Sequence, residues 1–181
     1  MTEFLKPNAY TDVYELSRLG QTLAGNVKLS DMKRLTDVLV SDDGFIQYKI
    51  TGIVGDKGWP GAIMELKGVL WLECNRCFKP MSFDLEREVV FRFVKDEVEA
   101  DSIPIEEDDD TEVVVGSQKL NLLDWIEEEV LLSVPLIPMH EEECSSVLAE
   151  QNKAEDKAVE AAVKENNPFA KLKELKGLRK E

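Results

Sequence analysis

Four residues in this chain have side chains that bind transition metals well, and they occur as two close pairs. Cys74 and Cys77 form a CxxC pair in the stretch LECNRCFKP, and 62 residues separate this pair from His140 and Cys144. A turn between strands that donates two thiolates, with two further ligands from elsewhere in the chain, is the donor set of a structural zinc site. The spacing therefore predicts a zinc site, with zinc as the candidate cofactor, at Cys74, Cys77, His140 and Cys144.

Two other interpretations of the CxxC pair remain open. In a redox pair of the thioredoxin type, the cysteines lie at a helix N-terminus, where the helix dipole lowers the thiol pKa. The residues around Cys74 indicate a strand, a turn and a strand instead, and Pro80 follows Cys77 by three residues. In the simplest interpretation, Cys74 is a small buried residue, Cys77 belongs to the turn, and neither binds anything.

The overall charge limits the partners that this protein can bind. The 181 residues include 22 Lys and Arg against 37 Asp and Glu, which gives a formal net charge of −15. Because phosphate contacts need clustered basic residues, this composition disfavours binding of nucleic acid over a broad surface. It favours basic partners, and it confines any contact with nucleic acid to a local basic patch.

The sequence lacks the patterns that are typical of membrane, exported and disulfide-bonded proteins. No apolar run approaches the roughly 20 residues of a membrane span, and residues 1–7 do not resemble a signal peptide. The odd count of three cysteines is typical of reduced thiols rather than a disulfide framework. We therefore expect a cytoplasmic protein with no membrane partner.

The sequence also lacks common patterns of enzyme active sites. Neither of the common glycine-rich phosphate-binding patterns is present, and the one histidine, His140, has no serine nearby in a recognisable nucleophile context. We expect no catalytic residues and no small-molecule substrate. A metal-dependent hydrolase that uses the acidic loop between residues 97 and 112 is the remaining enzymatic alternative.

Alternating apolar residues predict three successive strands around the CxxC pair. They cover residues 45–54, 64–74 and 83–93, and each has one apolar face and one charged or polar face. Met64 and Leu66, for example, alternate with Glu65 and Lys67. We expect an antiparallel sheet that is solvated on its second face, with the CxxC turn between the second and third of these strands.

Short helices and further strands are expected on either side of these three strands. Residues 14–19 form a helix that Gly20 ends, residues 25–29 an edge strand, and residues 113–115 a short strand. Ser30 and Asp31 offer caps for a helix whose apolar face is Met32, Leu35, Val38 and Leu39. Asn121 caps a further helix that ends at Pro135.

These patterns predict an α+β fold, with an antiparallel β-sheet core, short flanking helices and a charged C-terminal tail that ends in a basic amphipathic helix. We expect a single α+β domain over residues 1–140, an acidic and polar linker or exposed helix over residues 141–166, and the basic helix over residues 167–181. The candidate residues for contact with a partner or with RNA lie in that helix: Phe169, Lys171, Leu172, Lys173, Leu175, Lys176, Arg179 and Lys180. The alternative is a tail that packs on its own sheet.

Four stretches follow one another along about residues 16–176: RLGQTLAGNVKL, LECNRCFKPM, LNLLDWIEEEVLLSVPLIPMH and NPFAKLKELK. In this order they resemble the YceD family, known as large-ribosomal-RNA-subunit accumulation proteins. The resemblance implies a non-catalytic ribosome biogenesis factor that is needed for the synthesis, processing or stability of the large-subunit (23S) ribosomal RNA. It implies a ribosomal protein or a pre-ribosomal particle as partner, with 23S rRNA contacted through a local basic patch, and it brings no catalytic residues.

Three ways of acting remain open. In the first, the acidic body contacts a basic ribosomal protein or an assembling particle. In the second, the protein binds precursor rRNA directly and protects it, although the sheet strands offer few bases for this: Lys49, Lys67, Arg87 and Arg92. In the third, the chain is a small zinc-binding interaction module in which the metal only stabilises the fold.

Overall fold

The structure is a computed structural model that describes residues 4–6, 8–55, 57–104, 111–142 and 144. The chain forms two compact units, one of residues 1–75 and 79–139 and the other of residues 76–78 and 140–181. All the helices and strands below belong to the first unit. Most of the predicted linker over residues 141–166, namely residue 143 and residues 145–166, lies outside the described residues. The predicted basic helix over 167–181 and the acidic residues 106–110 also lie outside them, so these remain predictions.

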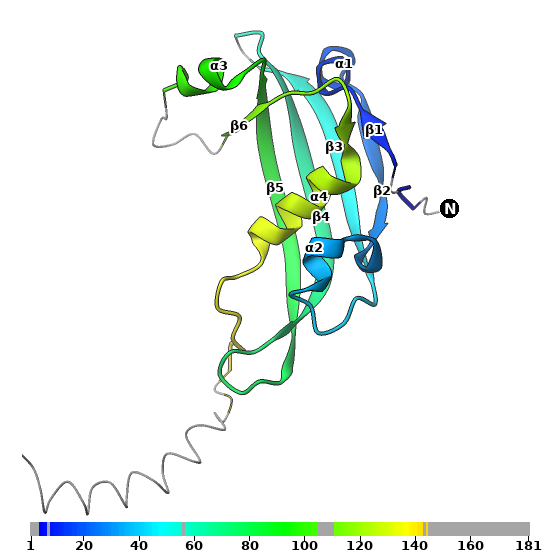
Figure 1. Cartoon of the computed structure of the whole chain (residues 1–181), viewed down its shortest axis with the longest axis vertical. Coiled ribbons are helices and arrows are strands. Elements are labelled where there is room, and N and C mark those ends of the chain that lie inside the picture. The colour runs from blue at the N-terminus through cyan, green and yellow to red at the C-terminus, as the bar shows by residue number, and fades with distance from the viewer. Residues whose placement is uncertain (1–3, 7, 56, 105–110, 143, 145–181) are drawn as a thin grey trace, which may run out of the picture. The chain divides into compact units, whose positions relative to one another are not determined.

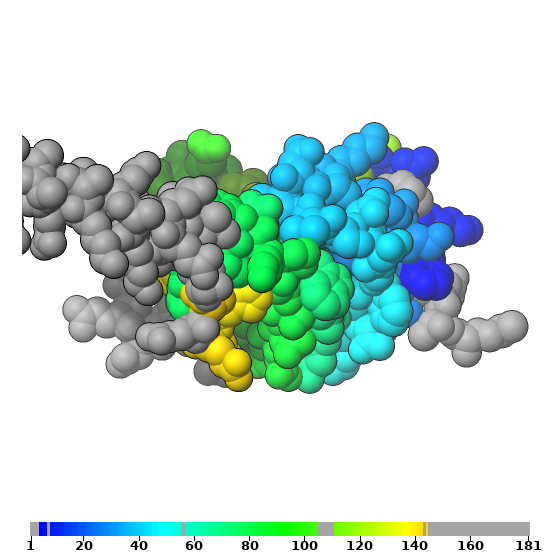
Figure 2. All heavy atoms as spheres, turned by 90° about the horizontal axis from the view of Figure 1, so that it is seen from below, coloured from blue at the N-terminus to red at the C-terminus, as the bar shows by residue number. Residues whose placement is uncertain are grey.

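The first unit is built on a five-stranded sheet with the strand order β2-β3-β4-β5-β6 (Figure 1). Its strands are β2 (Thr22–Lys28), β3 (Phe45–Val54), β4 (Pro60–Glu73), β5 (Pro80–Val94) and β6 (Thr111–Val115). The colours in Figure 2 run from green to blue across the surface and follow the order β5, β4, β3 and β2. A separate two-stranded sheet pairs β1 (Tyr10–Thr11) with β7 (Leu120–Asn121).

The predicted antiparallel sheet is confirmed for four strands and wrong for the fifth. β2, β3, β4 and β5 pair antiparallel with their neighbours, whereas β6 pairs parallel with β5. Between β5 and β6 the chain forms the short helix α3 (Glu97–Asp101) and continues to residue 110. This connection is long enough for the chain to return to the level of Val90, where the parallel pairing of β6 with the last residues of β5 begins.

Three helices cover one face of the sheet. They are α1 (Val13–Leu19), α2 (Lys33–Thr36), which follows the 3-10 turn η1 (Leu29–Asp31), and α4 (Leu122–Ser133). Leu16, Leu35 and Ile126, one from each helix, are fully buried in one core cluster with the inward residues of β3 and β4. Figure 1 shows α4 crossing this face of the sheet. Among the described helices, none has the length and apolar character that crossing a membrane needs.

Helix α1 begins and ends as its sequence predicts. The Asp12 carboxylate accepts hydrogen bonds from the backbone N–H groups of Tyr14 and Glu15, which would otherwise lack partners at the helix start. Gly20 closes the helix in the left-handed conformation, with φ of 57°, where a residue without Cβ carries no steric penalty. The predicted helix over residues 14–19 is confirmed.

A close backbone contact joins α1 to the sheet. A Cβ atom at Gly52 would lie 2.0 Å from the carbonyl oxygen of Leu16, so only glycine fits at this position. The buried Ser17 hydroxyl donates to the carbonyl oxygen of Ile53 at 2.5 Å and accepts from the N–H of Gly61 at 3.2 Å. Ser17 therefore fixes α1 to both β3 and β4.

The helix expected after Ser30 and Asp31 is shorter than its apolar pattern suggested. α2 ends at Thr36; Met32 and Leu35 are buried as expected, but Val38 is 49% exposed. The N–H of Val40 donates to the carbonyl oxygen of Trp71 at 2.8 Å, and Ser41 forms a bridge with Trp71. The chain therefore turns after α2 and joins β4 at Ser41, so the helix does not continue through Val38 and Leu39.

Helix α4 carries two buried carboxylates with different environments. Asn121 caps this helix by accepting from the N–H of Leu123, and α4 ends before Pro135 as predicted. The Glu127 carboxylate accepts from the N–H groups of Arg34 and Leu35 and from the Arg34 side chain, so it caps α2 from another element. These charge-assisted hydrogen bonds compensate for the burial of its charge.

Glu129 lacks such compensation. Its side chain is 3% exposed, and its Oε2 atom has no hydrogen-bond partner among the described residues. Burial, reinforced by the nearby Glu112 carboxylate on β6 and by Glu128, raises the pKa of Glu129 to about 7, although Arg87 on β5 opposes this shift. The ionised form of Glu129 is therefore unfavourable in the folded protein.

We predict that Glu129→Gln makes the protein more stable in alkaline solution. A carboxyl group whose pKa rises on folding stabilises the protein below its unfolded pKa of 4.5, and this contribution disappears as the pH rises to about 7. At about pH 8.5 the variant should gain on the order of 2 kcal/mol in free energy of unfolding, and the gain should shrink toward pH 5.

Urea unfolding at the two pH values measures this difference. The matched control is Glu97→Gln, the same substitution at an exposed position on α3 whose charge does not contribute to the raised pKa of Glu129. Equal pH dependence for wild type and Glu129→Gln would contradict the prediction.

Candidate metal centre

The candidate metal ligands begin at the end of a long β-hairpin. β4 and β5 pair from Gly61 with Arg92 to Glu73 with Pro80, whereas the pairing of β3 with β4 stops at Gly68. The last residues of β4 and the first residues of β5 therefore extend beyond β3. Residues 74–79 form the turn that connects the two strands.

The backbone of this turn is held by hydrogen bonds at both of its ends. The N–H of Cys74 donates to the carbonyl oxygen of Lys79 at 3.0 Å, which closes the turn. The N–H of Asn75 donates to the carbonyl oxygen of Pro138 at 2.8 Å, which anchors the chain that follows α4. Phe78 has φ of 57°, a left-handed conformation that residues with a side chain rarely adopt.

The segment after α4 positions the second pair of ligands. α4 ends at Ser133, and its C-cap residue Val134 is extended, as expected before Pro135. Within the second unit, the Arg76 side chain donates to the carbonyl oxygen of Glu142 at 3.4 Å, and Cys77 Sγ lies 3.5 Å from His140 Nδ1. Two residues of the CxxC turn thus contact the segment that carries His140 and Cys144.

All four predicted ligands lie together. The ligand atoms of Cys74, Cys77, His140 and Cys144 are all within 4.8 Å of one another. A tetrahedral zinc ion with bonds of about 2.3 Å to sulfur and 2.0 Å to nitrogen needs its ligand atoms roughly 3.5–3.8 Å apart. The distance of 3.5 Å between Cys77 and His140 already meets this requirement, and the remaining ligands need only small adjustments.

The burial of the ligands suits a structural metal site. Cys74 is fully buried and Cys77 is 3% exposed, while His140 and Cys144 are partly exposed. Three sulfur atoms and one imidazole nitrogen fill a tetrahedral coordination sphere, which leaves no position for a substrate or a reactive water. These residues could therefore bind a metal such as zinc. The site would lack the open coordination position that a catalytic metal centre needs.

The turn does not have the geometry of a redox pair. The CxxC residues lie between two strands, as the sequence predicts, rather than at the start of a helix. The helix dipole that activates a thioredoxin-type cysteine is therefore not available at this turn.

The four bases considered for RNA contact all interact with other residues. Lys49 pairs with Glu65, Lys67 with Glu86 and Arg87 with Glu112, and Arg92 lies over the ring of Trp59. Arg87 moreover follows the inward-facing Leu85 by two residues, which places it on the covered face of β5 rather than the solvated one. The other sequence-predicted contact residues, 169–180, lie outside the described residues.

The solvated face carries apolar residues that the sequence interpretation missed. Phe45 on β3 and Val69 and Trp71 on β4 are each more than two-fifths exposed and line one shallow hollow of about 300 Å³. The signal was present in the sequence, because Val69 and Trp71 occupy the positions that alternate with the buried Leu70 and Leu72. An apolar residue at an outward position indicates a surface that another molecule can cover.

Comparison with known proteins identifies the family. The model of the family described as "Large ribosomal RNA subunit accumulation protein YceD" matches residues 63–176, which contain all four candidate ligands. This chain belongs to the YceD family. A Haemophilus influenzae protein named "Large ribosomal RNA subunit accumulation protein YceD" is 34% identical over 123 residues, which cover 65% of this chain and 68% of that relative. No solved structure matches the chain.

We predict that Phe78→Gly stabilises this YceD-family chain. A left-handed residue with a side chain costs about 1 kcal/mol relative to glycine, and the Phe78 ring is 52% exposed, so little buried contact is lost. Thermal unfolding should give a higher Tm for Phe78→Gly and a lower Tm for Phe78→Val, whose β-branched side chain resists this backbone conformation. A Tm ranking in the reverse order would show that the Phe78 side chain stabilises the turn.

Proposed function

We propose that this protein supports the accumulation of large-subunit ribosomal RNA as a non-catalytic factor that binds a basic protein of the assembling ribosome. Membership of the YceD family carries this proposal. The closed set of four metal ligands and the acidic surface are consistent with binding rather than with a reaction.

The solvated side of β5 supports a basic protein as the partner. Asp84, Glu86 and Glu88 alternate along β5, are exposed and lie on the same side of the sheet. Of these three acids, only Glu86 pairs with a base among the described residues, and that base is Lys67. Because charge complementarity speeds encounter and selects the correct partner, this acidic strip favours a basic polypeptide segment.

The apolar hollow supports the same kind of partner. Val69 and Trp71 lie on β4, the strand next to the acidic strip, and Phe45 lies on β3, on the other side of β4. Aromatic side chains at a surface that becomes buried contribute much of the binding free energy, while charged residues around them set specificity. A segment that combines basic and apolar side chains fits both features.

Direct binding of precursor rRNA by the sheet has less support. Its bases are already paired with acids or placed over an aromatic ring, and three acids line β5. A sheet that binds RNA needs a positive potential and bases that are available to phosphate. Contact with 23S rRNA through the basic residues of the segment 167–181 remains a separate proposal.

We further propose that Cys74, Cys77, His140 and Cys144 bind one zinc ion with a structural role. The set of three sulfurs and one nitrogen suits zinc, and all four atoms are already close together. A zinc ion at this position would link the CxxC turn to residues 140–144 covalently. In this way it would stabilise the end of the long β4–β5 hairpin.

Zinc content tests this proposal. We expect one zinc ion for each untagged chain, measured by elemental analysis after gel filtration. Cys144→Ser should weaken zinc affinity at least about 100-fold, whereas Cys144→His keeps a ligand atom and should retain most of the binding. Because thiolates and imidazole must lose protons to bind metal, zinc should also be released on acidification.

A purified protein that contains no zinc, and that gives no thiolate-to-metal absorption with added cobalt, would exclude the site. Equal zinc content in wild type and Cys144→Ser would show that the metal binds elsewhere.

The proposed contact with a basic protein is tested by affinity purification from cells with and without RNase. We expect a ribosomal protein to remain bound after RNase treatment. Asp84→Lys combined with Glu88→Lys should reduce its recovery roughly tenfold, because the acidic strip then repels a basic segment. The matched control is Glu97→Lys with Asp101→Lys, which changes the net charge equally at exposed positions on α3.

Loss of every ribosomal protein with the RNA would contradict protein contact and favour direct RNA binding. The wider role is measured by the level of large-subunit rRNA in cells that lack the protein. An unchanged level would contradict the proposed function itself.

A further inference from the structure

The outer edge of β2 has backbone groups that no other strand uses. β2 is the terminal strand of the five-stranded sheet: it pairs with β3, and on its other side Asn26 forms a single bridge with Phe4. The N–H of Gly52 on β3 donates to the carbonyl oxygen of Gln21, so the backbone groups of Gln21 point toward β3. The directions of the backbone N–H and C=O groups alternate along a strand. Those of Leu23 and Gly25 therefore also point toward β3, and those of Thr22 and Ala24 point away from it.

A contact at the far end of β2 supports this assignment. The N–H of Leu5 donates to the carbonyl oxygen of Asn26 at 2.8 Å, so the backbone carbonyl of Asn26 points away from β3, as the alternation requires. The N-terminal segment therefore covers the edge at Asn26. No hydrogen bond joins the outward groups of Thr22 and Ala24 to other backbone groups in the described part of the chain.

A second strand edge faces the same space. β1 pairs with β7, and the carbonyl oxygen of Ala9 accepts from the N–H of Leu122 on that side. The N–H of Val13 likewise donates to the carbonyl oxygen of Ser117. By the same alternation, the backbone groups of Tyr10 point away from β7.

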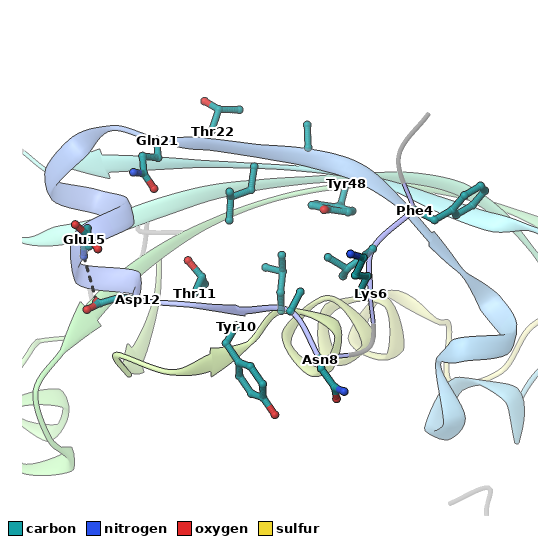
Figure 3. A pocket seen from close by; sticks show the side chains of 15 residues that line it. Phe4, Lys6, Asn8, Tyr10, Thr11, Asp12, Glu15, Gln21, Thr22 and Tyr48 are labelled. Atoms are coloured by element: carbon teal, nitrogen blue, oxygen red, sulfur yellow. Dashed lines mark hydrogen bonds between the residues drawn. The ribbon is translucent and has the colours of Figure 1, made fainter. Parts of the chain in front are cut away.

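A groove of about 680 Å³ separates these two edges (Figure 3). Its walls include Tyr10 and Thr11 of β1 and Thr22, Leu23 and Ala24 of β2. The figure shows Thr11 and Tyr48 directed into the groove from opposite sides. This volume lies in the range of pockets that hold sizeable ligands.

Beside polar residues such as Lys6, Asn8 and Gln21, the lining of the groove has an apolar part, which we call the floor. It includes Leu5, Ala9 and Leu23, which pack against the core, and the buried residues Tyr48 and Leu122. An added strand would place alternate side chains on this floor and the others toward solvent. The groove thus offers both requirements of strand addition, which are outward main-chain groups and a surface for every second side chain.

We propose that this groove binds an extended segment of a partner polypeptide, which adds as a strand to the outer edge of β2. Main-chain hydrogen bonds to Thr22 and Ala24 give the affinity, and apolar side chains at every second position of the segment occupy the floor. A net charge of −15 on the protein favours basic residues at the solvent-facing positions of the segment. This site is separate from the acidic strip on β5.

The probe is a displayed library of short linear peptides selected against the full-length chain. The best peptide is synthesised and added to wild-type protein, and amide hydrogen exchange is measured for each residue of β2. We expect exchange to slow at Thr22 and Ala24, whose N–H groups point outward. Leu23 and Gly25, already bonded to β3, should change little.

A pair of variants at one position supplies the second test. Ala24→Pro removes an outward N–H and places a ring in the groove without breaking a hydrogen bond to β3. It should weaken peptide binding about tenfold or more. Ala24→Val keeps the N–H and suits a strand, so its affinity should stay within about twofold of wild type.

Several results would overturn the proposal. They are a library that yields no binding peptide, slowed exchange confined to residues other than Thr22 and Ala24, and equal affinity for Ala24→Pro and wild type. Self-association through β2 that Ala24→Pro abolishes would make a second copy the occupant and would also overturn it. The exchange measurement uses wild-type protein, so it decides the question even where Ala24→Pro does not fold.

Discussion

The pairing of β4 with β5 is the interaction on which the rest of the structure depends. These strands are 14 and 15 residues long and stay in register from Gly61 with Arg92 to Glu73 with Pro80. Their inward residues, with those of β3, form the surface on which α1, α2 and α4 pack. Because one register fixes which side chains face inward, it also fixes the acidic strip and the apolar hollow on the solvated face.

The same hairpin places the candidate metal ligands. Its turn lies beyond the last pair of residues that joins β3 to β4. The turn instead contacts the chain after α4 through Asn75 and Pro138, and its cysteines lie near His140 and Cys144. A metal ion suits such a location because it can join two segments that are far apart in the chain through strong bonds.

Charge and apolar surface have different roles in this protein. The acids on the solvated face leave few bases available for phosphate, so the described surface favours basic polypeptides over nucleic acid. The groove between β1 and β2 is lined in part by the outward edge of β2, which offers backbone groups as well as side chains. In the two proposals, the acidic strip would select a partner mainly by charge, and the groove mainly by main-chain hydrogen bonds.

The sequence by itself determined the local features of this chain. Alternation between apolar and charged residues predicted β3, β4 and β5 and the location of the CxxC turn between them. Gly20 and Asn121 marked helix ends because capping depends on interactions within a few residues. The chemistry of Cys74, Cys77, His140 and Cys144 was also readable, since only these residues supplied sulfur and imidazole in pairs.

Only the tertiary structure decided the features that depend on residues far apart in the chain. The parallel direction of β6, the early end of α2 at the bridge to Trp71 and the placement of Arg87 beside Glu112 all arise from such contacts. The open edge of β2 also depends on which strand ends the sheet, and no local pattern encodes strand order. The physical reason is that periodicity specifies a face of each element, whereas the partner of that face is selected by packing of the whole chain.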